Sequence, residues 1–229
     1  MIEWSETHLA IRDMTRRFVE AEIAPKLEEL EHGDTPPYEV LRKLFQTFGM
    51  REMASMRHAS AVRRAEKREA ALARGETPEE STERAESGDQ VAMQLLPIVE
   101  LSRYCPGMVT ALGVSVGLTA GTILSKGTAR QMQRWALDLM TLDKIGAWAI
   151  TEPSSGSDAF GSMKASARRV DGGYLLNGNK TFITNGPYAD TTVFICKLDE
   201  GNDPKVRKVL SFVLDRGMKG FTQSRPLRK

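Results

Sequence analysis

The chain has 229 residues, 41% of them hydrophobic, which is enough to bury a core in one large or two modest domains. Its 32 basic and 30 acidic residues nearly cancel, which excludes recruitment of nucleic acid or an anionic membrane by the net charge. Cys105 and Cys196 lie far apart and the three histidines lack ligand spacing, so we expect buried thiols, a reducing compartment and no metal site. The charged N-terminus lacks the apolar segment of a secretory signal, so we expect a cytoplasmic protein.

Two amphipathic helices are predicted at the start of the chain. Residues 4–23 carry apolar side chains at helical spacing, with Ser5 as the N-cap and Pro25 near the end of the helix. Residues 36–49 begin with proline and end at Gly49, and the apolar side chains between them recur at i, i+3, i+4 and i+7. These side chains are Leu41, Leu44, Phe45 and Phe48. Each helix is therefore expected to bury one face.

A charged segment extends from Arg57 to Gly88 and has few large apolar side chains. Its first half is basic and its second half is acidic, and Thr77 followed by Pro78 is typical of a helix N-terminus. We therefore predict two exposed helices here. Because the charges nearly cancel, a solvated excursion is favoured over the alternative, a docking surface for a partner or a polyanion.

The run from Pro106 to Ser125 contains no charged residue and is long enough to cross a membrane as a helix. Gly113, Gly117 and Gly121 form a stripe of small residues along it, but its threonines and serine make the run only mildly apolar. The favoured interpretation is a buried helix whose glycine face lets another backbone approach closely, with a membrane span as the alternative. A capping box at residues 128–131 begins one more helix, so about the first 140 residues are predicted to be helical.

The pattern changes from helix to strand at Lys144. Short apolar or alternating runs follow at residues 145–150, 164–170, 174–186, 191–198 and 209–216, separated by Gly, Asn, Asp or Pro. No helical segment lies between them, and no GxGxxG or P-loop motif is present, which favours an antiparallel sheet or small barrel over a nucleotide-binding βαβ fold. We therefore predict an α+β fold, with a helical domain at 1–143 that contains the charged insert at 57–88, and a β-domain at 144–229.

Two loops carry the most specific motifs of the sequence. AWAITEPSSGSD, at residues 147–158, and NGNKTFITNG, at residues 177–186, each place hydroxyls, glycine and backbone amides after a predicted strand. In this order and after a helical region, the pair resembles the middle β-domain of the acyl-CoA dehydrogenase family, which has a TEPxxGSD loop and an NGxKxxITNG hairpin. The resemblance covers nearly the whole chain apart from the insert. It implies an FAD-dependent oxidoreductase of fatty acid and lipid metabolism that dehydrogenates an acyl-CoA thioester between Cα and Cβ.

Flavin chemistry explains why such residues would stand in these loops. A flavin gathers negative charge near its pyrimidine edge on reduction, so it needs hydrogen-bond donors there. The resemblance implies cofactor-binding roles for Trp148, Ile150, Thr151, Gly156 and Ser157 in the first loop, and for Phe182, Ile183 and Thr184 in the second. Thr151 would hydrogen-bond the ring, Thr184 would offer its hydroxyl near N5, and Ser157 would also reach the acyl-CoA. The family often has tryptophan where this chain has Phe182, so the apolar face stays and an indole donor is lost.

The hydroxyls of these loops also have a purely structural interpretation, because Ser and Thr in turns often bond the neighbouring backbone. Glu152 and Asp158 form a candidate pair for acid and base chemistry, but their spacing in a loop fixes no separation, and Pro153 favours a structural Glu152. The resemblance places the catalytic base on a glutamate of a C-terminal helical domain, which we expect to be absent from this sequence. No catalytic residue is therefore predicted here, and this chain alone is expected to be inactive.

The resemblance further implies an acyl-CoA substrate, an electron-transfer flavoprotein or similar acceptor, and a homo-oligomer when the protein is complete. Two alternatives stay open: an acyl-CoA oxidase or flavin monooxygenase of the same superfamily, and a non-catalytic or partner subunit of a split flavoenzyme. A nucleic-acid or membrane protein is a third class, which rests on the basic residues at 63–68 or on the uncharged helix alone.

Overall fold

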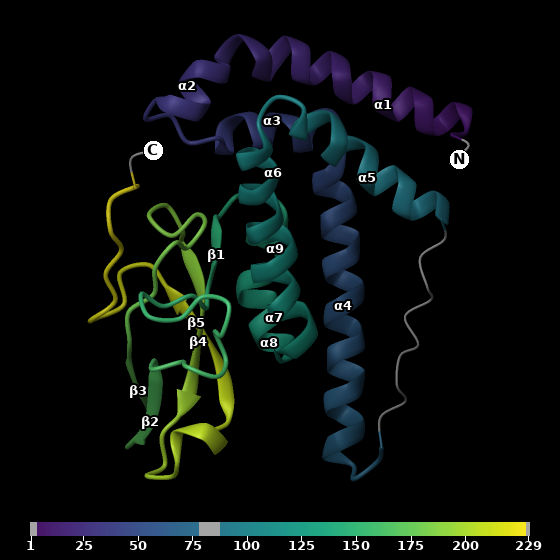
Figure 1. Ribbon diagram of the computed structural model, residues 1–229. Coiled ribbons are helices and arrows are strands. Elements are labelled where there is room, and N and C mark those ends of the chain that lie inside the picture. The colour runs from purple at the N-terminus through teal and green to yellow at the C-terminus, as the bar shows by residue number, and fades with distance from the viewer. Residues whose placement is uncertain (1–3, 78–87, 228–229) are drawn as a thin grey trace.

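A layer of helices packs beside an open sheet in the computed structural model, which describes residues 4–77 and 88–227 (Figure 1). The helices α6 to α9 stand between the sheet and the long helix α4, and α1 to α3 lie across one end (Figure 1). The helical N-terminal region and the following strands confirm the α+β prediction.

The first predicted helix is confirmed at its start and wrong at its end. Helix α1 (Glu6–Phe18) begins with a capping box in which the Ser5 hydroxyl accepts from the His8 amide and Nδ1 of His8 accepts from the Ser5 amide. The helix does not end near Pro25, because the chain winds on through a π-helical segment (Val19–Ile23) and a 3₁₀ turn (Ala24–Lys26) into α2 (Leu27–His32). Pro25 lies in the first turn of that 3₁₀ segment, where a missing N–H costs little.

The second predicted helix is confirmed as α3 (Tyr38–Thr47), and Gly49 follows it with a φ of 62°. In the charged segment after it, the first of the two predicted helices is present but is not wholly exposed. A single helix, α4 (Met50–Ala73), runs through its first part and buries a face of small side chains. These are Ala54, Ala61, Val62 and Ala65. These small residues let α4 lie close to α9 while the charged side chains of α4 stay in solvent. The predicted helix start at Pro78 lies outside the described residues.

The uncharged run forms one continuous helix through α6 (Pro106–Leu112), a π-helical segment (Gly113–Ala120) and α7 (Gly121–Lys126). Its buried face carries Ala111, Ser115, Thr119 and Ile123, and this face packs on β1 and on the helix α9. The prediction that another backbone covers the glycine face is wrong for the described residues. A Cβ atom added at Gly113, Gly117 or Gly121 would meet nothing within 4 Å there.

Within the described ranges, this helix from Pro106 to Lys126 has the length and apolar composition of a membrane span, with a mean hydropathy of 1.6. Buried core helices of soluble proteins share both properties, and 39% of the most apolar part of this helix is buried. The helix is therefore weak evidence for a membrane.

The remaining helices are α5 (Gly88–Ser102), α8 (Ala129–Gln131) and α9 (Leu137–Met140), with a π-helical segment (Met132–Ala136) between the last two. The predicted capping box is confirmed, because the hydroxyl of Thr128 accepts from the Gln131 amide and the Gln131 side chain accepts from the Thr128 amide. The prediction of helix up to about residue 140 therefore holds for the described residues.

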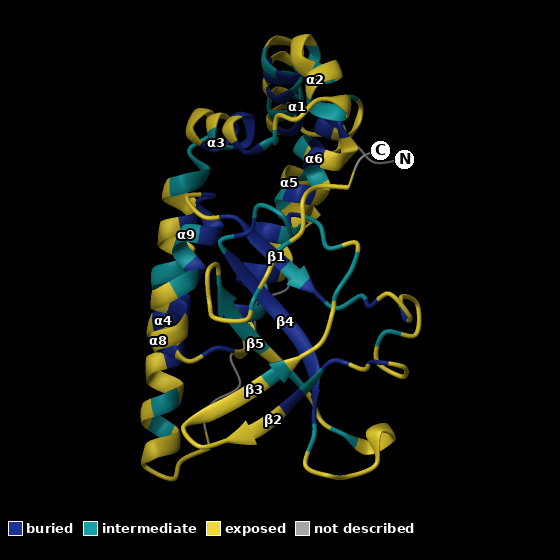
Figure 2. Ribbon diagram, turned by 90° about the vertical axis from the view of Figure 1, so that its left-hand side faces the viewer, coloured by how far each residue is buried: buried dark blue, intermediate teal, exposed yellow. Residues whose placement is uncertain are grey.

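The strand β4 (Thr191–Leu198) is the centre of the sheet and is buried along its whole length (Figure 2). One edge of β4 pairs antiparallel with β5 (Val209–Asp215). The other edge pairs parallel with β1 (Gly146–Ala149) and, further along, with β2 (Ser166–Val170). The strand β3 (Gly173–Asn177) pairs antiparallel with β2 and completes the sheet.

The sheet is therefore mixed and open, and the predicted antiparallel sheet or closed barrel is wrong. The prediction took the lack of intervening helices as evidence for antiparallel pairing. Parallel neighbours need only a long crossover, usually but not always a helix. Between β1 and β4 this crossover consists of the two motif loops and the β2–β3 hairpin. They carry the chain from the end of β1 back to the side of the sheet where β1 begins, so that β4 starts there as well.

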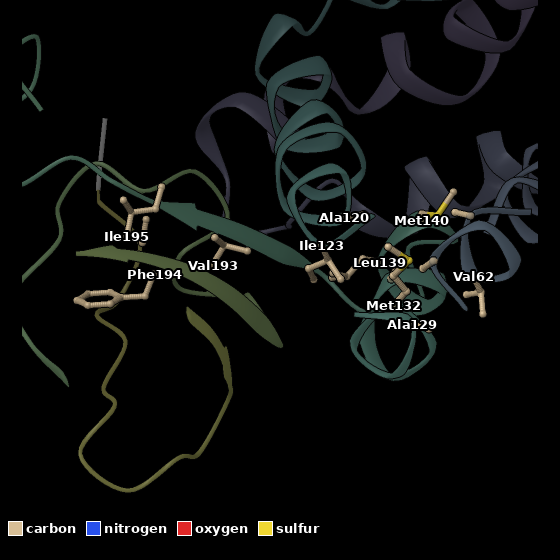
Figure 3. Packing of buried hydrophobic residues seen from close by; sticks show 14 of the residues in the cluster. Val62, Ala120, Ile123, Ala129, Met132, Leu139, Met140, Val193, Phe194 and Ile195 are labelled. Carbon is tan, nitrogen blue, oxygen red and sulfur yellow. The ribbon is translucent and has the colours of Figure 1, made fainter. Parts of the chain in front are cut away.

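One core joins the helices to the sheet. Val193 of β4 points toward Ile123 of α7 and Leu139 of α9, all of them almost fully buried (Figure 3). A second core lies between α1, α3 and α6, around Ile23, Leu41 and Met108. The first core contains residues from both sides of the predicted domain boundary between residues 143 and 144, so this boundary stays a prediction.

Candidate functional site

The two motif loops lie against each other at the ends of β1 and β3. The amide of Thr181 donates to the carbonyl oxygen of Thr151 over 3.0 Å, so the loops meet although thirty residues separate them in sequence. The tertiary structure thus brings together the two segments that carry the predicted site residues.

A buried ion pair fastens the loops. Nζ of Lys180 lies 2.9 Å from Oε1 of Glu152, and each side chain is only 5% exposed. Lys180 also donates to the carbonyl oxygen of Ile150 over 2.9 Å. The Glu152 carboxylate accepts from the amides of Lys164 and Ala165 over 2.8 and 2.9 Å, which ties the start of β2 to the same point.

The surroundings of Glu152 keep it ionised. Burial alone would raise the pKa of its carboxyl, but the bonds from the Lys164 amide, the Lys180 ammonium and the Ala165 amide together hold that pKa below its ordinary value. A carboxylate that is held by three donors and has a lowered pKa is a weak base for a substrate proton. The structural interpretation of Glu152 agrees with this geometry, and Asp158 is bonded elsewhere, to the hydroxyl of Ser162.

Thr151, Ser157 and Thr184 differ from ordinary turn residues. Within residues 4–77 and 88–227, the hydroxyls of these three form no hydrogen bond, and the amide of Thr151 also has no acceptor. The neighbouring Ser155, by contrast, donates to the carbonyl of Asp158 over 2.6 Å, as turn chemistry requires. Turn chemistry therefore describes Ser155, whereas the roles of the three predicted residues stay predictions.

The aromatic residues of the two loops take different positions. Phe182 is 77% exposed and adopts a φ of 54°, an uncommon conformation for a residue with a side chain. Trp148 is half-buried, and its indole N–H donates to the hydroxyl of Thr122 on α7 over 3.2 Å. The indole N–H of Trp148 is therefore already engaged with α7.

The other predicted residues support the loops. Ile150 and Ile183 are half-buried and pack against the core shared by the helices and the sheet. Gly156 is exposed, and a Cβ at this position would approach only the methyl group of Thr151, at 3.9 Å. These three residues therefore shape the loops and carry no polar side-chain group.

Asn185, which was not among the predicted site residues, joins three parts of the fold. Its side chain is buried, its φ is 64°, and its Oδ1 accepts from the Tyr38 hydroxyl over 3.0 Å. Its Nδ2 donates to the carbonyls of Ala111 and Gly146, each over 2.9 Å. Lys180 was missed in the same way. The available signal was a cationic residue and a carboxamide inside loops that otherwise present hydroxyls and apolar groups.

An open hollow of about 450 Å³ lies beside the first loop. Glu152, Lys164 and Asn179 contribute to its wall, whereas Thr151, Ser157 and Thr184 do not. The three hydroxyls without partners therefore do not line this hollow.

The described residues contain no group of three or more His, Cys, Asp or Glu side chains that could hold a metal ion. Cys105 and Cys196 are buried thiols, as predicted; Sγ of Cys105 donates to Oε1 of Glu31 over 3.0 Å, and burial raises the pKa of the Cys196 thiol to about 11. The donors available to a ligand at the two loops are thus hydroxyls and backbone amides.

Two family profiles match this chain. "Acyl-CoA dehydrogenase, N-terminal domain" matches residues 5–55, and "Acyl-CoA dehydrogenase, middle domain" matches residues 147–229. Among curated proteins, the mitochondrial isovaleryl-CoA dehydrogenase of Arabidopsis thaliana is 29% identical over 99% of this chain and 49% of its own length. An acyl-CoA dehydrogenase of Bacillus subtilis is 30% identical over 98% of the chain and 52% of its own length. The chain thus spans about half the length of these relatives.

Solved structures agree with these matches. Butyryl-CoA dehydrogenase of Megasphaera elsdenii is 26% identical with a TM-score of 0.68, over 97% of this chain and 51% of that one. An acyl-CoA dehydrogenase of Bacillus anthracis complexed with FAD is 26% identical with a TM-score of 0.66, over 99% of this chain and 34% of that one. A chain described as electron transferring flavoprotein of Acidaminococcus fermentans is 28% identical with a TM-score of 0.70, over 98% and 52%.

Proposed function

This chain belongs to the acyl-CoA dehydrogenase family, and on that premise we propose that it forms the flavin-binding, substrate-facing part of an enzyme that dehydrogenates an acyl-CoA thioester. One observation carries the proposal. The two motif loops are bonded to each other, yet the hydroxyls of Thr151, Ser157 and Thr184 form no hydrogen bond within the described residues. Donors that are left without partners on loops bonded to each other suit a ligand that accumulates negative charge.

FAD fits this donor set. The amide and hydroxyl of Thr151 and the hydroxyl of Thr184 would serve the electron-rich edge of the flavin, and the exposed ring of Phe182 would cover an apolar part of it. Trp148, Ile150, Gly156 and Ile183 would shape the same surface, as the resemblance implies. Bound FAD would supply the acceptor for the hydride that leaves Cβ of the substrate.

The contribution of this chain to the reaction is to bind and orient. Ser157 is exposed at the end of the first loop and would position the acyl-CoA. The α-proton must go to a carboxylate, and Glu152 is engaged in its ion pair. We therefore propose that the base lies outside the two loops, on a part of the enzyme that closes over them.

The proposal extends to partners. The family resemblance and the likeness to the A. fermentans chain support an electron-transfer flavoprotein as the acceptor of the electrons. A homo-oligomer is the assembly that we propose. The cytoplasmic location predicted from the N-terminal residues stays a prediction.

Titration of the purified chain with FAD tests the proposal. We expect the flavin fluorescence to change with saturation, and we expect Thr151→Val combined with Thr184→Val to weaken binding at least about tenfold, since each replaced donor contributes about 1 kcal/mol. The matched control is Ser155→Ala, whose hydroxyl serves the turn. A wild-type chain that takes up no FAD, or equal binding by all variants, would contradict the proposal.

A further inference from the structure

Lys180 reaches both neighbours of Thr151. Its ammonium donates to the carbonyl of Ile150, which precedes Thr151, and to the carboxylate of Glu152, which follows it. The next residue of the same loop, Thr181, bonds the carbonyl of Thr151 itself. Three consecutive residues of the first loop are therefore held by two consecutive residues of the second.

This arrangement fixes the direction of one amide. The peptide between Ile150 and Thr151 is planar and trans, so its carbonyl and its N–H point in opposite directions. Since Lys180 holds the carbonyl of Ile150 from inside the fold, the N–H of Thr151 must point the other way. That N–H has no acceptor among the described residues.

The ammonium also changes the strength of this donor. A cation bonded to a peptide oxygen draws electrons from the amide and makes the N–H of the same peptide a better donor. The effect is largest at low exposure, and the side chain of Lys180 is 5% exposed. Glu152 neutralises the charge without contacting that peptide oxygen.

We propose that Lys180 is a positioning residue that aims and polarises the amide of Thr151 toward an electron-rich acceptor. The class of acceptor that fits is a carbonyl oxygen such as those of a flavin pyrimidine ring. The inference rests on the proposed function only for the identity of that ligand. The rival explanation is that Lys180 serves solely as the counter-ion of Glu152.

Two variants separate these explanations. In Lys180→Met, the carboxylate of Glu152 is buried without a counter-ion and the carbonyl of Ile150 loses its donor. In Lys180→Met combined with Glu152→Gln, no unpaired charge is buried, but the carbonyl of Ile150 still has no donor. Glu152→Gln alone is the reference for the double variant, because in both of them either the Lys164 or the Ala165 amide loses its acceptor while only the double variant also loses the donor to Ile150. A counter-ion role predicts that the double variant matches Glu152→Gln alone, and a positioning role predicts that it does not.

The matched control is Lys197→Met. Lys197 is also a buried lysine and donates to two carbonyl oxygens, those of Gly161 and Pro204, each over 3.2 Å. Those carbonyls lie outside the bonded part of the two loops. A general cost of removing a buried lysine would therefore appear in this variant as well.

The first readouts need no cofactor. In the full chain, we expect hydrogen exchange at the Thr181 amide to accelerate at least about tenfold in both Lys180 variants, because the loop contact opens more often. We also expect the amide nitrogen resonance of Thr151 to shift in both, since it reports the bond at the Ile150 carbonyl. Lys197→Met should change neither. Wild-type values in the double variant would overturn the inference.

FAD titration then addresses the ligand. Where the wild-type chain binds FAD, the double variant should bind it at least about tenfold more weakly, as expected for a misaimed donor. Unchanged affinity would refute the positioning role. A wild-type chain that binds no FAD would refute the proposed function instead, and the exchange and resonance measurements would still decide whether Lys180 sets the Thr151 amide.

Discussion

Tyr38 and Asn185 are 147 positions apart in sequence and share a buried hydrogen bond of 3.0 Å, from the phenolic hydroxyl to the side-chain carbonyl oxygen. This bond connects α3 to the second motif loop. The amide group of Asn185 continues the connection to α6 and β1 through the carbonyls of Ala111 and Gly146. One carboxamide thus bonds the loop to α3, α6 and β1.

Replacing Asn185 by aspartate should destabilise the fold strongly. Aspartate keeps the acceptor for Tyr38 but loses both donors, and it would face the carbonyl oxygens of Ala111 and Gly146 with a buried charge. We expect the free energy of unfolding to fall by about 2–4 kcal/mol, measured by urea denaturation. Tyr38→Phe, which removes one hydroxyl, should cost only about 1–2 kcal/mol. Equal costs for the two variants would contradict the assigned hydrogen bonds.

Stability in acid should depend on Glu100. The guanidinium of Arg16, which bonds this buried carboxylate, opposes the effect of burial and, with Arg103, holds the pKa of Glu100 below its ordinary value. A lowered pKa in the folded state contributes stability that is present above the unfolded-state pKa of about 4.3 and is lost as the pH falls through the folded-state value. Glu100→Gln should therefore flatten the decline in unfolding free energy below about pH 4.3. An unchanged slope in a pH series of urea titrations would refute this.

The open glycine face of the uncharged helix predicts a gain in stability. Alanine at Gly117 would meet no atom within 4 Å in the described residues, and it has a higher helix propensity than glycine. We expect Gly117→Ala to raise the free energy of unfolding by about 0.5–1 kcal/mol. Gly49→Ala is the contrasting variant: because Gly49 has a φ of 62°, alanine there should cost about 1 kcal/mol. Destabilisation by Gly117→Ala would mean that something covers this face.

Cys196 should resist alkylation in the folded protein. Its thiol is fully buried in β4, and burial raises its pKa to about 11, so little reactive thiolate is present at neutral pH. We expect mass spectrometry to detect iodoacetamide modification of Cys196 only after unfolding in urea. Modification at the rate of a free thiol under native conditions would contradict the position of β4 in the core.

The sequence by itself determined the local structure and the pair of loops that carry the site. Capping boxes at Ser5 and Thr128 and the helical periodicity in α3 are short-range patterns, because each residue interacts with neighbours a few positions away. The motif residues Thr151 and Thr184 were found for the same reason, since their chemistry and spacing are written in two short segments.

Only the tertiary structure decided how these segments pair and what holds them. Whether β1 runs parallel to β4 depends on the route of the 41 intervening residues, which no local periodicity records. The same applies to Lys180, Glu152 and Asn185, whose roles come from partners that approach in space, such as Ile150 and Tyr38. A charged or amide side chain in a loop favours solvent until the fold supplies a buried partner, and that partner is what the linear pattern does not contain.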